Sequence, residues 1–210
     1  NGVELERFKP GPRAEARASL GVAADAEVVL FLGNLYPVKG PDVLLDAWAS
    51  VRARRPRAHL YFVGDGPLQA PLAARVRKEG LADCVTFAGR RPHEEVPRWQ
   101  QAANLTVLSS RSEGIPNALL EALACGTPVV ATDVGGVAEA LPASGAGRLV
   151  PKENPAALAD ALVATLAEDL QPAAVRSTVQ LHSWADAAQR MLESLQRAIA
   201  GARVVRTTTA

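Results

Sequence analysis

The sequence predicts an α/β protein whose core is a doubly wound, mostly parallel sheet of six strands. Three observations predict this class. Six short apolar runs alternate with segments of helical periodicity, as strand–helix–strand units do. The runs lack the polar–apolar alternation of half-exposed strands, which favours a sheet covered on both faces. Polar and glycine-rich segments follow the runs, where open sheets of this kind bind ligands.

Each element is predicted by its local pattern. The segment 41–55 places Val43, Trp48 and Val51 on one helical face. Gly126 follows the helix predicted over 116–125, and glycine commonly ends a helix. The predicted strands are 27–33, 58–64, 84–89, 105–109, 127–132 and 147–150. The predicted helices are 41–55, 67–79, 94–102, 116–125, 155–168 and 184–200.

One domain is expected between two terminal segments. Residues 1–11 are expected to be an interdomain linker, 12–182 the domain, 183–202 a C-terminal helix and 203–210 a frayed tail. A length of 210 residues fits one large α/β domain. Because the chain begins with Asn1 and shows no signal-peptide pattern, we expect a segment of a longer protein.

Composition and charge exclude several classes of protein. Hydrophobic residues make up 48% and charged residues 21% of the chain, which excludes a mainly disordered protein. The formal charge is only +1, from 23 basic and 22 acidic residues. Nucleic-acid binding needs a basic surplus or a basic face, so we expect no nucleic-acid partner. Every apolar run is shorter than the roughly 18 residues that span a bilayer.

The cysteines and histidines indicate no metal site. Cys84 and Cys125 stand alone in apolar stretches, so we interpret them as small buried side chains. A disulfide or a metal pair is the alternative, but closely spaced Cys/His pairs are missing from the sequence. His59, His93 and His182 lie far apart along the chain, so we infer no zinc site.

The segment 109–130 predicts an anion site at the start of a helix. Pro116 begins that helix, and the N–H groups of Asn117 and Ala118 form its first turn. Such N–H groups have no partner within the helix, and the helix dipole favours negative charge beside them. Gly114 lets a ligand approach the backbone closely.

Two glutamates flank this anion site. Glu113 precedes the helix, and Glu121 lies about a turn along it. A carboxylate accepts hydrogen bonds and can bind both hydroxyls of a diol. An anion with an acid at each end therefore fits a nucleotide-diphosphate sugar. The alternative is that Glu113 is a solvated loop residue and Glu121 an exposed helix residue, because this spacing is common by chance.

Two further loops hold candidate binding residues. Lys39 stands in the first strand-to-helix loop, where it can pair with a phosphate, and a solvated lysine is the alternative. Arg90, Arg91 and His93 follow the third strand, where they line a pocket near a base or form a plain surface loop. The Gly64–Gly66 pair lacks the third glycine of a dinucleotide fingerprint, so we interpret it as a tight turn.

These motifs together resemble the C-terminal, donor-binding half of retaining glycosyltransferases with the GT-B fold. The family is glycosyltransferase family 4, also called the group 1 glycosyltransferases. The matching pieces follow the family's order and cover roughly residues 1–170. They are NGVELERF (1–8), FLGNLYPVKGPDVLLDA (31–47), LYFVGDGPL (60–68), VTFAGRRPHEEV (85–96) and SSRSEGIPNALLEALACGTPVVATDVGGVAE (109–139).

The resemblance implies a role for each matching residue. Glu113 contacts the donor sugar and supports catalysis, and Glu121 binds the ribose hydroxyls. Arg90 and Arg91 lie near the base. The residues that bind the donor diphosphate are Lys39, Asn34, Gly114, Ile115, Asn117 and Ala118.

One departure from the family pattern concerns the diphosphate. The family commonly has an arginine directly after the glycine of the first loop, where this chain has Asn34. Asparagine cannot supply the charged fork of a guanidinium, so one cationic contact is missing. We expect either weaker donor binding or replacement by a nearby side chain such as Arg111.

The resemblance also implies the reaction. A UDP- or GDP-sugar is the donor and a glycan or lipid the acceptor, with retention of configuration and without a cofactor or metal. An N-terminal domain that binds the acceptor is absent from this sequence, and the helix 183–202 is expected to cross to it. This chain alone should therefore bind nucleotide and transfer little sugar. The intact enzyme is expected in the cytoplasm, where a lipid acceptor brings it to the inner face of the membrane as a peripheral protein.

Three rival functions differ in testable features. A nicotinamide-binding domain needs the full glycine fingerprint, which the first loop lacks. A sugar-nucleotide epimerase of similar architecture would change the donor when no acceptor is present. A non-catalytic nucleotide-sugar-binding module would not need both Glu113 and Glu121.

Overall fold

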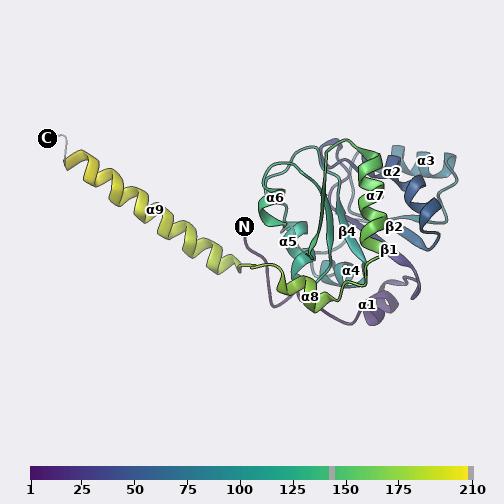
Figure 1. The fold of residues 1–210 in the computed structure, drawn as a ribbon, viewed down its shortest axis with the longest axis horizontal. Helices are drawn as coiled ribbons and strands as arrows, with labels where there is room; N and C mark the ends of the chain where they lie inside the picture. The colour runs from purple at the N-terminus through teal and green to yellow at the C-terminus, as the bar shows by residue number, and fades with distance from the viewer. Residues whose placement is uncertain (142–144, 208–210) are drawn as a thin grey trace.

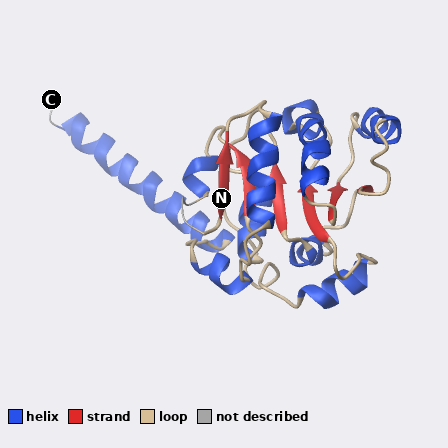
Figure 2. Ribbon diagram, turned by 45° about the vertical axis from the view of Figure 1, so that its right-hand side comes forward, coloured by secondary structure: helices blue, strands red, loops and turns tan. Residues whose placement is uncertain are grey.

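A single sheet of six strands forms the centre of the molecule, in the order β3-β2-β1-β4-β5-β6, and every neighbouring pair is parallel (Figure 2). The computed structural model describes residues 1–141 and 145–207, with side chains as far as residue 199. The predicted fold class is confirmed, and the sheet is wholly parallel. The strands are β1 (Glu27–Leu32), β2 (Ala58–Val63), β3 (Val85–Gly89), β4 (Leu105–Leu108), β5 (Val129–Thr132) and β6 (Gly147–Val150).

Helices cover both faces of this sheet (Figure 1). The predicted helices are found, with shifts of a few residues at their ends, and α1, α6, α8 and the 3₁₀ turn η1 were not predicted. The helix α1 escaped prediction because it buries only Ala16 and Arg17, too few residues for a periodic apolar pattern. The helical elements are α1 (Arg13–Leu20), η1 (Pro37–Lys39), α2 (Pro41–Arg54), α3 (Gln69–Lys78), α4 (Val96–Ala102), α5 (Asn117–Ala124), α6 (Val137–Ala140), α7 (Pro155–Leu166), α8 (Pro172–Ser177) and α9 (Trp184–Thr207).

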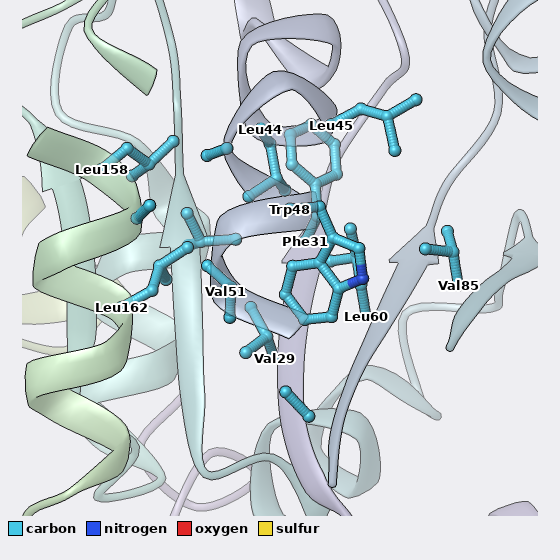
Figure 3. Packing of buried hydrophobic residues seen from close by; sticks show 14 of the residues in the cluster. Val29, Phe31, Leu44, Leu45, Trp48, Val51, Leu60, Val85, Leu158 and Leu162 are labelled. Carbon is cyan, nitrogen blue, oxygen red and sulfur yellow. The ribbon is translucent and has the colours of Figure 1, made fainter. Parts of the chain in front are cut away.

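The largest apolar cluster lies between one face of the sheet and the helices α2, α3 and α7. Trp48 of α2 is fully buried in it, near Phe31 and Leu60 of the sheet and Leu162 of α7 (Figure 3). Side chains of α5 and α8 and of the N-terminal segment form a second cluster, and Trp99 of α4 belongs to a third. Burial on both faces explains why the strands carry apolar residues without alternation.

The two cysteines are buried, as predicted. Neither Cys84 nor Cys125 is in a disulfide. Burial, together with the nearby Glu121 carboxylate, raises the pKa of the Cys125 thiol to about 12. The neutral thiol is therefore the stable form, and it acts as a small apolar side chain.

Residues 1–11 contain no helix or strand, but part of this segment is fixed to the domain. Val3 and Phe8 are buried in the cluster that contains α5. The Val3 N–H donates to the carbonyl of His182 at 2.9 Å, just before α9. This segment therefore begins beside the start of α9, packs along the domain close to α5, and ends near Gln101 of α4.

The helix α9 extends away from the domain (Figure 1). It continues to Thr207, so residues 203–207 of the expected tail are helical, and residues 208–210 lie outside the described part of the chain. Among the described residues, no helix combines the length and hydropathy needed to cross a membrane. One stripe of α9 is apolar and exposed, with Trp184, Met191, Leu192, Leu195 and Ile199.

Candidate functional site

The candidate site lies where the strand order reverses, between β1 and β4. The chain leaves β1 toward one edge of the sheet and leaves β4 toward the other, so the loops 33–40 and 109–116 lie side by side. Gly40 makes this approach possible: it has a φ of +61°, and a Cβ there would stand 2.0 Å from the Ser109 carbonyl oxygen. The Ser109 hydroxyl donates to the Gly40 carbonyl at 2.7 Å and joins the two loops.

An ion pair between these loops is the chemical centre of the site. Lys39 Nζ lies 2.6 Å from Oε1 and 2.9 Å from Oε2 of Glu113. The Glu113 side chain is 8% exposed and that of Lys39 is 33% exposed. Ser110 Oγ donates to Glu113 Oε1 at 2.6 Å. Three hydrogen bonds thus fix a nearly buried carboxylate, while the ammonium keeps one side toward solvent.

The backbone around Glu113 is fixed by the loop that follows β5. Gly135 has a φ of +55°, and a Cβ there would lie 1.8 Å from the Glu113 carbonyl oxygen. The Gly136 N–H donates to the Gly114 carbonyl at 3.1 Å. Any side chain at Gly135 would therefore displace Glu113, which gives this loop a role in positioning the acid.

The ion pair opens into a cavity of about 470 Å³ at the start of α5. Pro116 precedes α5 and offers no side-chain acceptor to its first N–H groups. These groups are therefore available to an anion. The structure brings most of the predicted diphosphate-binding residues to this cavity. Its lining includes Asn34, Lys39, Glu113, Ile115, Asn117 and Ala118, while Gly114 lies in the adjoining loop.

Glu121 lies outside this cavity, one turn along α5. Its side chain is 13% exposed, and its Oε1 is 3.2 Å from Nε2 of His93. Burial raises the pKa of Glu121, and the hydrogen bond from His93 opposes that shift. One turn of helix is about 5.4 Å long, so Glu121 and the anion site are close enough for one extended ligand.

Arg90 and Arg91 lie away from the ion pair. Both are exposed on the loop after β3. The Arg91 guanidinium stacks over the Trp99 ring at 5.9 Å and lines a separate cavity of about 620 Å³ between α1, α4 and the sheet. The structure therefore does not bring them into the cavity that holds Lys39 and Glu113.

Arg111 is paired with two carboxylates and is not among the residues that line the cavity of Asn34. Its guanidinium makes two hydrogen bonds to the Asp42 carboxylate, at 3.0 and 2.8 Å, and one to Glu153 at 3.1 Å. These contacts raise the pKa of Arg111 and lower that of Asp42. This pairing favours the other alternative, weaker donor binding, because the Arg111 charge is already neutralised by two carboxylates.

Two residues near the site, Ser110 and Asn1, were not predicted to act there, and for His93 the contact with Glu121 was not predicted. Ser110 orients Glu113, and its position three residues earlier is a signal that could have been used. Asn1 donates to the Ile115 carbonyl at 2.6 Å and to Asn117 Oδ1 at 3.3 Å. The contact of His93 with Glu121 joins segments 28 residues apart and has no local signal. Within the described ranges, no group of three acidic, histidine or cysteine side chains could hold a metal.

Comparison with known families identifies this arrangement. Residues 26–168 match the family described as glycosyl transferases group 1. The chain belongs to the group 1 glycosyltransferases. The match includes the loops after β1, β3, β4 and β5, and therefore the candidate site from Asn34 to Gly136.

Similar group 1 glycosyltransferases support this assignment. The chain is 38% identical to D-inositol 3-phosphate glycosyltransferase 1 of Catenulispora acidiphila over 96% of its own length and 51% of that protein. It is 36% identical to D-inositol 3-phosphate glycosyltransferase of Thermobispora bispora, over 94% of this chain and 49% of that one. The chain thus spans about half the length of these relatives.

Two similar solved structures identify the fold of this chain. Sucrose-phosphate synthase of Thermosynechococcus elongatus has a TM-score of 0.78 at 31% identity, covering 95% of this chain and 52% of that one. HepE of Anabaena, solved in complex with UDP-glucose, has a TM-score of 0.80 at 28% identity, covering 94% and 56%. The sheet is the Rossmann-like half of a GT-B fold.

Proposed function

We propose that this chain is the donor-binding half of a retaining glycosyltransferase of family 4. It binds a UDP- or GDP-sugar, and the intact enzyme moves the sugar to a glycan or lipid acceptor. The observation that carries the proposal is the Lys39–Glu113 ion pair beside the start of α5 in one cavity. That cavity combines positive charge, backbone donors and a fixed carboxylate, which are the groups a sugar diphosphate requires.

Lys39 and the first turn of α5 bind the diphosphate in this proposal. An ammonium has three N–H donors, so Lys39 can keep a contact with Glu113 and still donate to phosphate. The N–H groups near Asn117 and Ala118 add backbone donors and the positive end of the helix dipole. Asn34 supplies a neutral amide to the lining of the same cavity.

Glu113 faces the donor sugar and supports the reaction. Glycosyl transfer leaves positive charge on the sugar and increases negative charge on the departing diphosphate. The Glu113 carboxylate, which Ser110 and Lys39 hold, stabilises the positive charge on the sugar. Lys39 and the helix terminus stabilise the negative charge on the diphosphate. The acceptor then attacks on the face from which the diphosphate leaves, and configuration is retained.

The nucleoside lies further along α5. Glu121 accepts the two ribose hydroxyls, and the loop that contains Arg90 and Arg91 lies near the base. UDP is the favoured nucleotide, because the similar HepE was solved in complex with UDP and with UDP-glucose. The names of the relatives make inositol 3-phosphate a first acceptor to test.

The acceptor site belongs to the part of the enzyme that lies outside this chain. The exposed apolar stripe of α9 has the character of a surface that packs against that part. We therefore propose that residues 183–202 cross to an N-terminal domain. The isolated chain then binds nucleotide but transfers little sugar, and the intact enzyme works in the cytoplasm, at the inner membrane face when its acceptor is a lipid.

Calorimetry with the chain tests donor binding. UDP or GDP is expected to bind at millimolar concentration or below, and uridine or guanosine more weakly than its diphosphate. Absence of binding by both diphosphates at millimolar concentration would contradict the proposal.

Product analysis of the intact enzyme tests the reaction. Transfer with retention, unchanged by a metal chelator, is expected, since Lys39 and the α5 terminus supply the positive charge. An inverted product would refute the retaining mechanism. A new sugar nucleotide formed from donor alone would instead indicate an epimerase, and binding without any product a non-catalytic module.

A further inference from the structure

His93 connects the N-terminal segment to Glu121. Its ring follows β3 and makes one contact with each of its two nitrogens. Nε2 lies 3.2 Å from Glu121 Oε1, and Nδ1 lies 3.1 Å from Nη1 of Arg7. Phe8 packs beside the ring, with centroids 5.3 Å apart. Glu4 pairs with Arg7 at 3.2 Å and lies 4.0 Å from Nδ1 of His93.

The contact with Arg7 determines which nitrogen of His93 carries the proton. A guanidinium has only donors, so the Nδ1 atom that it contacts must accept. A neutral imidazole with an unprotonated Nδ1 carries its proton on Nε2. His93 therefore donates from Nε2 to Glu121, and the direction Arg7 → His93 → Glu121 follows from the chemistry of the three groups.

The hydrogen bond from His93 counteracts the effect of burial on the ionisation of Glu121. Burial raises the pKa of Glu121 and so disfavours the ionised form. A carboxylate that binds a diol must be ionised and held in one orientation. The hydrogen bond from His93 stabilises the charge and occupies Oε1, which leaves Oε2 and the remaining lone pairs for a ligand.

We propose that His93 is a positioning residue that orients Glu121 toward the ribose diol, in the tautomer set by Arg7. The proposal rests on the proposed function, since it takes Glu121 as the ribose-binding acid. It also assigns a role to the N-terminal segment. Arg7 lies next to Phe8, which is buried against the domain, so this segment supports the nucleoside site from outside the cavity.

The test separates the diol from the rest of the nucleotide. UDP and 2′,3′-dideoxy-UDP are titrated into the chain and into the His93→Ala variant. Because His93 acts through the diol, His93→Ala should weaken UDP about tenfold and the dideoxy analogue less than twofold. The exposed neighbour Glu94 provides a matched control on the same loop, and Glu94→Ala should change neither affinity. Equal weakening of both ligands by His93→Ala would overturn the proposal.

Two further variants keep the result interpretable. In His93→Gln, the amide can still donate to Glu121, so about half of the lost free energy of UDP binding should return. Failure of rescue, with the protein folded, would contradict a positioning role. Glu121→Ala should remove the preference for UDP over the dideoxy analogue. If Glu121→Ala still prefers UDP over the dideoxy analogue, the proposed ribose role of Glu121 is wrong. If Glu121→Ala loses this preference but the His93 variants keep it in full, only the inference about His93 is wrong.

Discussion

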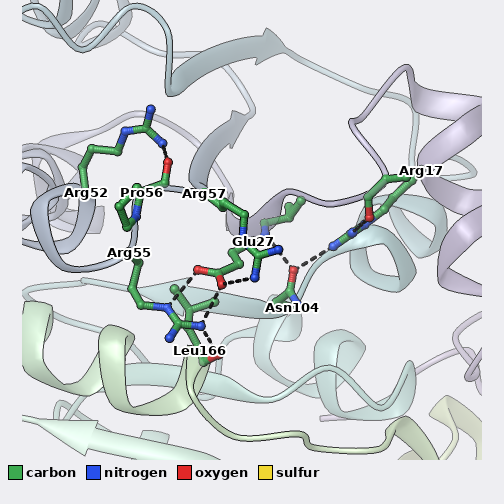
Figure 4. Close-up of polar contacts among 10 residues, drawn as sticks. Arg17, Glu27, Arg52, Arg55, Pro56, Arg57, Asn104 and Leu166 are labelled. Carbon is green, nitrogen blue, oxygen red and sulfur yellow. Dashed lines mark hydrogen bonds and ion pairs between the residues drawn. The ribbon is translucent and has the colours of Figure 1, made fainter.

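Ion pairs lie at both ends of the sheet, and only the pair at the carboxyl end lies beside one of the cavities described above. At the amino end, Glu27 of β1 makes two hydrogen bonds to Arg55, at 2.9 and 2.7 Å, and one to Arg57 at 3.3 Å (Figure 4). Arg55 also donates to the Leu166 carbonyl at 2.9 Å. The Glu27 side chain is 12% exposed, and this cluster opens onto none of the cavities described above.

At the carboxyl end, Lys39 and Glu113 form an equally short pair. The difference is that the cavity beside this pair is also lined by Asn117 and Ala118 at the start of α5, to which Pro116 offers no side-chain acceptor. An ion pair alone is therefore no sign of function in this fold. What distinguishes a binding site from a purely structural ion pair is the presence of backbone N–H donors without a side-chain acceptor next to the pair.

The largest expected effect breaks the pair at the carboxyl end. In the intact enzyme, Glu113→Gln should lower turnover at least about 100-fold, because the developing charge on the sugar loses its carboxylate. UDP affinity should stay equal or rise, because Lys39 is freed for the phosphates. Steady-state kinetics and calorimetry measure both. Unchanged turnover would remove Glu113 from the mechanism.

Breaking the pair at the amino end should give the opposite pattern. Glu27→Ala leaves Arg55 without its carboxylate and should lower the free energy of unfolding by about 2 kcal/mol. UDP affinity should not change, since this cluster is at the far end of the sheet. Urea denaturation and calorimetry test this, with Glu27→Gln as the milder control. A loss of UDP affinity would show that the two ends are coupled.

Lys39→Ala sharpens the assignment of the phosphate site. Loss of the cation should weaken UDP about tenfold or more, since Glu113 then repels the diphosphate without compensation. Uridine should bind almost as before. Lys39→Met keeps the apolar stem and serves as the control. Equal losses for UDP and uridine would refute the phosphate role.

The raised pKa of Glu121 predicts a pH dependence. Because the pKa lies above its ordinary value, the ionised form is lost at a higher pH than for an exposed glutamate. The preference for UDP over 2′,3′-dideoxy-UDP should fall about fivefold as the pH drops below that pKa. Taking the ratio of two diphosphates cancels phosphate titration, and the His93→Gln variant serves as a control without the imidazole. A pH-independent ratio would contradict this role.

The smallest effect concerns Asn34. Asn34→Arg adds a guanidinium to the cavity wall and should raise UDP affinity about threefold. Asn34→Gln changes length without charge and should have little effect. Isothermal titration compares the two. An unchanged affinity in Asn34→Arg would mean that the side chain does not reach the diphosphate.

The sequence predicted the fold well because its signals are local. Apolar runs such as β1 and β4 sit between turn residues, and the face of α2 repeats with helical period. The helix α1 was not predicted because its contacts are with residues distant in sequence. Arg17 donates to the Ala102 carbonyl and to Asn104, and Figure 4 shows the contact with Asn104. The end of α9 was misplaced because the helix continues through Gly201, a residue type that commonly ends a helix, as far as Thr207.

The site was predicted in part for the same reason. Residues within one loop and its helix, such as Glu113 and Asn117, share a short motif with a physical meaning. The pairing of Arg111 with Asp42 was not predicted, because Asp42 is 69 residues away in sequence but within hydrogen-bond distance in space. The contact of His93 with Glu121 was missed for the same reason.

By itself, the sequence determined the six strands, six of the helices, the parallel direction of the strands and the loops that carry chemistry, since propensity, periodicity and turn residues act over a few positions. Only the tertiary structure decided that β4 lies beside β1, which brings Lys39 to Glu113 across 74 residues. The tertiary structure also decided which charged side chains form ion pairs away from any cavity and which line the candidate site. Strand order and burial arise from packing the whole chain at once, and no short stretch of residues encodes them.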